Sequence, residues 1–135
     1  MSKADIAIEK HGRGYNCAQA VACAFAEDIG VDEAMLYKAC EGFGGGMGCG
    51  LNACGALMGA AVVNGMVGSD GNIEHAGGTK RDTVRNSAEL LKAFTERTGA
   101  LSCKDIKTGN NGGAFTSCVD CIRIGVEVAE EILGL

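Results

Sequence analysis

Six glycines fall within the nine residues 42–50 of this chain. Glycine loses more backbone entropy on ordering than any other residue, so this stretch is poorly suited to a regular helix or strand. Glycines collect in this way where the backbone takes positive φ angles or passes very close to another group. Helical periodicity resumes directly afterwards, and Cys49 and Cys54 flank the junction. We therefore predict a glycine-rich loop that enters a central helix and delivers a cysteine to a thiolate site; the alternative is a simple crossover between helices.

The remainder of the chain has the periodicity of helices. Apolar residues recur three and four positions apart, and no stretch alternates with a period of two. The length of 135 residues suits one domain, over residues 1–135. Only 4% of the residues are aromatic, so the core must use small side chains and closely packed helices. The sequence predicts an all-α fold, a compact bundle of about five to six helices.

The helix boundaries follow from capping residues and glycines. Asn16 with Gln19 three residues later has the pattern of a capping box. Asp32, Asn52, Ser102 and Ser117 precede other apolar-periodic segments in the same way. The expected helices span residues 2–9, 17–28, 33–40, 53–67 and 79–98, with a short turn after Ser102, a polar loop over 108–114 and a last helix from Cys118.

Charge and hydropathy limit the partners. The formal net charge of −5 and the lack of a basic patch argue against nucleic acid. The apolar run at 56–67 is too short and too rich in glycine to span a bilayer, and the chain does not open with a secretory pattern. We expect a cytoplasmic protein without a membrane partner. The Gly/Ala faces of the helices suggest a homodimer.

Eight cysteines are many for a chain of this size. In a reducing compartment they indicate metal binding, redox chemistry or burial rather than structural disulfides. Four of them share one context, because each falls in the first turn of an expected helix: Cys17, Cys54, Cys103 and Cys118. A helix N-terminus carries partial positive charge and free N–H groups, which stabilise a thiolate. These four are predicted to converge on a metal or redox site; the alternative is plain buried cysteine.

The other four cysteines have different contexts. Cys49 lies in the glycine-rich loop, and Cys121 forms a Cys-x-x-Cys pair with Cys118. Both are additional candidates for the site. Cys23 and Cys40, inside and near the end of expected helices, are predicted to pack in the core.

Several motifs resemble a known family. They are the segment 14–21 (GYNCAQAV), the segment 42–48 (GFGGGMG), Cys54-Gly55-Ala56 with Gly59, and the later Cys103 and Cys118. Together they resemble the C_GCAxxG_C_C family, whose members are described as redox-active and are named for this cysteine pattern. The resemblance covers nearly the whole chain and implies that its four cysteines are Cys17, Cys54, Cys103 and Cys118. A related module in split-Soret cytochromes is thought to hold an iron–sulfur centre, although this chain has no Cys-x-x-Cys-His haem site.

The resemblance implies a small redox protein with an iron–sulfur cluster, most simply [2Fe–2S], bound by these four cysteines. Such a protein acts in electron transfer or redox sensing with a partner redox protein, as a carrier rather than a classical enzyme. We expect backbone N–H groups near the cluster from Gly45, Gly46, Gly48 and Gly55. The four extra cysteines depart from the family pattern and leave the type of cluster open.

Two other hypotheses remain. The first is a metal-free thiol–disulfide protein, in which Cys118 or Cys54 attacks and Cys121 or Cys49 resolves. The second is a structural zinc module. Zinc sites usually bring cysteines in close pairs, and this chain has a single Cys-x-x-Cys.

Overall fold

The structure, a computed structural model, describes residues 1–109 and 116–135. Within these ranges the chain forms seven α-helices and no β-strand, which confirms the all-α prediction. The helices are α1 (Lys3–Gly12), α2 (Cys17–Ala24), α3 (Glu33–Cys40), α4 (Gly55–Gly68), α5 (Lys80–Thr98), α6 (Cys103–Thr108) and α7 (Cys118–Leu133). The structure has one α-helix more than the sequence predicts, α6, which forms where only a short turn was predicted. Its last residue is the first residue of the predicted polar loop. Residues 110–114 of that loop lie outside the described residues.

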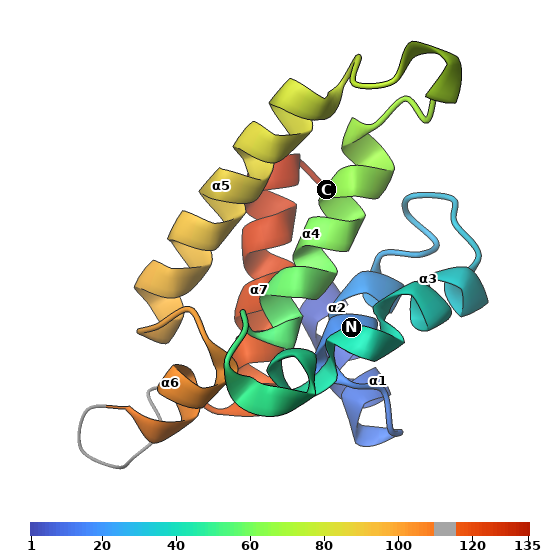
Figure 1. Cartoon of the computed structure of the whole chain (residues 1–135). Coiled ribbons are helices and arrows are strands. Elements are labelled where there is room, and N and C mark those ends of the chain that lie inside the picture. The colour runs from blue at the N-terminus through green and yellow to red at the C-terminus, as the bar shows by residue number, and fades with distance from the viewer. Residues whose placement is uncertain (110–115) are drawn as a thin grey trace.

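Helix α4 occupies the middle of the bundle (Figure 1). It packs against α2, α5 and α7, and α7 in turn contacts α1 and α5. Helices α4 and α7 begin at the same end of the bundle, where α6 and the turn at Gly46–Gly50 also lie (Figure 1). The connection from α4 to α5, which includes the short 3-10 helix Ile73–His75, lies at the opposite end. The first residues of several helices therefore lie at one end of the molecule.

Close helix packing depends on glycine where α2 meets α4. A Cβ atom at Gly59 would lie 2.5 Å from the carbonyl oxygen of Ala18 and 3.1 Å from Cβ of Val21. On α7, a Cβ at Gly125 would lie 3.0 Å from the carbonyl oxygen of Ala56. This Gly/Ala surface packs within the chain, so it no longer argues for a homodimer, which stays a prediction.

Helix α2 is shorter than the sequence predicts. It ends at Ala24 rather than at residue 28. The N–H groups of Phe25 and Ala26 donate to the carbonyls three residues earlier, at Ala22 and Cys23. The chain therefore leaves the α-helix through a series of tight turns before α3.

The predicted cap of the central helix is wrong. Asn52 does not cap α4, which begins at Gly55 with Cys54 as its N-cap. Ala53 instead pairs with Ser102 in an isolated antiparallel bridge. This contact between distant segments holds Ala53 out of the helix, so the helix starts later than the local pattern suggests.

Candidate functional site

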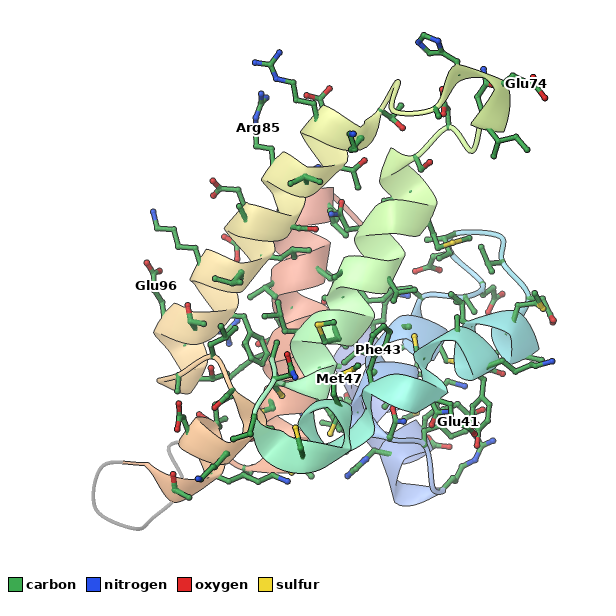
Figure 2. The ribbon with its side chains drawn as sticks, viewed as in Figure 1. Glu41, Phe43, Met47, Glu74, Arg85 and Glu96 are labelled. Atoms are coloured by element: carbon green, nitrogen blue, oxygen red, sulfur yellow. The ribbon has the colours of Figure 1, made fainter. Side chains whose placement is uncertain are left out.

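Five cysteines meet at the end of the bundle where the helices begin. They line a cavity of about 40 Å³. The lining residues are Cys17, Gly45, Cys54, Gly55, Cys103, Ile106, Lys107, Thr116, Cys118 and Cys121. Figure 2 shows the side chains at this end of the molecule, where Met47 is labelled. The structure thus brings together all four cysteines predicted for the site, and Cys121 with them.

Local capping places three of these cysteines at the first position of a helix. Cys17 follows Asn16, whose side chain accepts a hydrogen bond from the N–H of Gln19 at 2.9 Å and completes the predicted capping box. Cys103 follows Ser102, and Cys118 follows Ser117. Each serine hydroxyl accepts a hydrogen bond from the backbone N–H three residues later, at 3.0 and 3.1 Å. These cysteines therefore lie beside the partial positive charge of helix N-termini.

The bridge between distant segments places the fourth cysteine. The N–H of Cys54 donates to the carbonyl of Leu101 at 3.1 Å, and the N–H of Cys103 donates to the carbonyl of Asn52 at 3.0 Å. These two hydrogen bonds hold the backbones of Cys54 and Cys103 side by side. They hold the start of α4 against the start of α6.

The glycines predicted for the site divide into two groups. Gly45 and Gly55 line the cavity, and a Cβ at Gly55 would lie 3.3 Å from Cβ of Cys17. Gly46, at a φ of +63°, would bring a Cβ within 2.9 Å of Cβ of Cys103. Gly48 has no heavy atom within 4 Å of its Cβ position. At positions 46 and 55 the backbone passes so close to a cysteine that a side chain would be crowded. At position 48 the surroundings leave room for a Cβ atom.

Cys54 has surroundings that favour its thiolate. Hydrogen bonding from the Cys121 thiol, together with the N–H groups of Ala56 and Leu57 and the charge of Lys107, lowers the pKa of Cys54 to about 7, against the opposing effect of burial. The backbone donors near Cys54 come from the first turn of α4. At neutral pH, Cys54 is therefore a ready nucleophile or metal ligand.

Two neighbouring cysteines keep their protons. Burial, followed by the nearby charges of Cys54 and Cys118, raises the pKa of Cys17 to about 12. The hydrogen bond to Cys54, and then burial, raise the pKa of Cys121 well above its ordinary value. Of these three cysteines, Cys54 is therefore the one whose surroundings favour the thiolate.

Lys107 belongs to the site although its position in the sequence did not suggest it. It lines the cavity from α6, four residues after Cys103. The negative charges of Cys118 and Cys103 raise the pKa of Lys107. A helix over residues 103–108 would have placed Lys107 on the same face as Cys103, but the sequence predicted only a turn there.

The remaining cysteines lie elsewhere. Cys49, an additional candidate in the sequence, is exposed and does not line the cavity. Its sulfur instead donates to the carbonyl of Gly46 at 3.6 Å. Cys23 and Cys40 are buried, as expected for core cysteines.

In residues 1–109 and 116–135, no group of three or more His, Cys, Asp or Glu side chains is arranged to hold a metal ion. None of the helices in the described part of the chain has the length and apolar character needed to cross a lipid bilayer.

Comparison with known proteins gives one match. Residues 15–132 match the family model described as "Putative redox-active protein (C_GCAxxG_C_C)". No curated protein and no solved structure matches the chain. The matched range includes all the cysteines of the cavity.

Proposed function

This chain belongs to the C_GCAxxG_C_C family of redox-active proteins, and we propose that it carries or senses electrons through an iron–sulfur cluster, most simply [2Fe–2S]. The ligands are Cys17, Cys54, Cys103 and Cys118, as the resemblance implies. The observation that supports this proposal is the convergence of five cysteines, from four segments of the chain, on one small cavity.

The donor set suits such a cluster. Iron–sulfur clusters are bound by cysteine thiolates, four of them in a [2Fe–2S] centre. Cysteine is the one metal-ligating side-chain type among the residues that line the cavity in the described ranges. The thiols do not stand in a ready arrangement around one metal ion, but a [2Fe–2S] cluster divides its four cysteines between two irons.

The surroundings also suit a group with net negative charge. The starts of α2, α6 and α7 and the first-turn N–H groups of α4 face the cysteines, and Lys107 adds a full positive charge. Such groups set the reduction potential of a bound cluster. When bound, the cluster supplies one-electron transfer to a partner redox protein.

The test is a visible spectrum with iron, sulfide and zinc analysis on protein purified without oxygen. We expect sulfur-to-iron absorption with stoichiometric iron and sulfide. Cys54→Ser removes a ligand and should abolish most of both signals. The matched control is Cys40→Ser, which changes a buried cysteine outside the cavity and should leave the absorbance in place.

Three results would contradict the proposal. A colourless, metal-free protein after reconstitution would favour thiol chemistry. Zinc without iron would indicate a structural module. Full retention of iron in Cys54→Ser would show that the cluster lies elsewhere.

A second candidate is a metal-free dithiol, and the pairing of Cys54 with Cys121 is what favours it. Cys54 has the lowered pKa of an attacking thiol, and the Cys121 thiol is its hydrogen-bond partner. Exchange with a disulfide substrate would form one disulfide between Cys54 and Cys121 and reduce the substrate to two thiols, which take up the two electrons and the two protons. This is one of the pairings that the sequence left open, with Cys54 as the attacking thiol and Cys121 as the resolving one, whereas Cys49 does not line the cavity.

Peptide mapping after mild oxidation tests this candidate. A disulfide between Cys54 and Cys121 in a protein without iron would support it. If the oxidised protein has as many free thiols as the protein prepared without oxygen, the dithiol function is excluded.

A further inference from the structure

We propose that Lys107 is a positioning residue of the cysteine site, whose ammonium group stabilises negative charge on the sulfurs of Cys103 and Cys118. The family pattern consists of cysteines, glycines and an alanine and assigns no role to this lysine. The inference deepens the proposed function, since it concerns the same site.

The place of Lys107 in the cavity carries the argument. In the described part of the chain, it is the one charged residue that lines the cavity. Four positions separate it from Cys103 on α6, so the two side chains lie on one face of that helix. Cys118, at the start of α7, lines the same cavity. One ammonium group therefore lies in the cavity that both of the later cysteines of the pattern line.

The rest of the cavity explains why a cation is needed. Its other lining residues are cysteine, glycine, isoleucine and threonine, which bring no full charge that could balance thiolates. Helix N-termini supply only partial charge. Negative charge that develops on Cys103 or Cys118, with a cluster or without one, therefore has Lys107 as its nearest full counter-charge among the lining residues.

The adjacent Lys104 provides a matched control. It carries the same charge on the same short helix, but its backbone and Cβ lie against Gly50 and it does not line the cavity. Both lysines are exposed at the residue level, so either can be replaced without opening the core.

The experiment measures local charge in metal-free, reduced protein. Cys103 and Cys118 are alkylated with iodoacetate, which is negatively charged, and with iodoacetamide, which is neutral. Both reagents react with the same thiolate and release iodide, so the ratio of the two rates reports the electrostatic potential at the sulfur and not the proportion of thiolate. Peptide mapping gives this ratio for each cysteine.

We expect Lys107→Met to lower the ratio by about three- to tenfold at both cysteines, on the order expected for loss of one charge at close range. Lys107→Arg should keep it near the wild-type value, and Lys104→Met should change it by less than about twofold because a more distant exposed charge is screened. In wild-type protein, 1 M salt shortens the Debye length to about 3 Å and should lower the ratio toward that of Lys107→Met.

An unchanged ratio in Lys107→Met, or an equal fall in Lys104→Met, would overturn the proposal. If Lys107→Met does not fold, Lys107→Gln removes the same charge and is judged by the same criterion. Because the protein contains no metal in this experiment, the result stands whether or not a cluster is found by the spectroscopic test. A missing cluster therefore contradicts the proposed function and leaves the role of Lys107 to be decided by alkylation.

Discussion

Cys54 in the cavity and the two buried cysteines outside it, Cys40 and Cys23, have pKa values shifted in opposite directions. Cys54, in the cavity, has its pKa lowered to about 7, whereas burial raises the pKa of Cys40 to about 11. Burial, with the charges of Glu33 and Cys40, raises the pKa of Cys23 to about 12. The exposed fractions are similar: 5% for Cys54, 0% for Cys40 and 3% for Cys23. The extent of burial therefore does not decide the protonation of these sulfurs.

What differs is the set of groups around the sulfur. The Cys121 thiol is the main cause of the lowered pKa of Cys54, and the N–H groups of Ala56 and Leu57, in the first turn of α4, add to it. Cys40 is the last residue of α3, where the helix dipole is negative and disfavours a thiolate. Cys23 lies near the end of α2, where its thiol donates to the carbonyl of Glu33 at 3.7 Å. The donors around Cys54 thus favour its thiolate, whereas burial dominates at Cys40 and Cys23, and also at Cys17 although Cys17 begins a helix.

The reactivity of metal-free protein toward iodoacetamide tests this contrast most strongly. At pH 7, Cys54 is about half thiolate and Cys40 about 10⁻⁴ thiolate, as follows from their pKa values of about 7 and 11. A more basic thiolate is a better nucleophile, which offsets part of this difference, so we expect Cys54 to react at least about 100-fold faster. Its rate should rise from pH 6 to 8 and then level off, because a lowered pKa is titrated in this range.

Mass-spectrometric mapping of the alkylated peptides measures both rates in one sample. Unfolding in urea is the control, since it should make Cys40 and Cys54 react alike. Equal rates in the folded protein, or faster labelling of Cys40, would contradict the distinction between Cys54 and the buried cysteines outside the cavity.

The packing of α2 on α4 brings the cavity cysteines together, and Gly59 tests it. Gly59→Val would force a Cβ to within 2.5 Å of the Ala18 carbonyl, so we expect a loss of about 3 kcal/mol or more in the free energy of unfolding. Gly65→Ala on the same helix is the control, because no heavy atom lies within 4 Å of its Cβ position. That change should be neutral or should stabilise by up to about 1 kcal/mol. Urea denaturation measures both, and a Gly59→Val protein of normal stability would show that α2 can move away from α4.

The caps at the helix starts should have a smaller effect. Ser117→Ala removes the hydrogen bond to the N–H of Asp120, and Ser2→Ala removes the equivalent one to Asp5 at the start of α1. Each should lower the free energy of unfolding by about 1 kcal/mol, measured by urea denaturation. Similar values would mean that the cap beside Cys118 serves folding in the same way as a cap outside the cavity. A cost above about 2 kcal/mol for Ser117→Ala alone would instead tie this cap to the stability of the cavity.

Local chemistry explains which features the sequence predicted. A cap involves residues only three apart, so Asn16, Ser102 and Ser117 could be identified without knowledge of the fold. The same reasoning placed Cys17 and Cys118 at helix starts. The prediction that Asn52 caps α4 was wrong because the segment around Asn52 pairs with Leu101 and Ser102. A contact between distant segments leaves no local pattern in the sequence.

The sequence by itself therefore determined the all-α fold, most helix starts and the cysteines that stand at them, because helix capping and periodicity act over a few residues. Only the tertiary structure decided that these starts share one end of the bundle, that Cys121 joins them while Cys49 does not, and that Lys107 faces their sulfurs. Glycine at 59 and 125 allows this approach, and its effect depends on which helix lies opposite. Which helix lies opposite each glycine depends on packing across the whole chain.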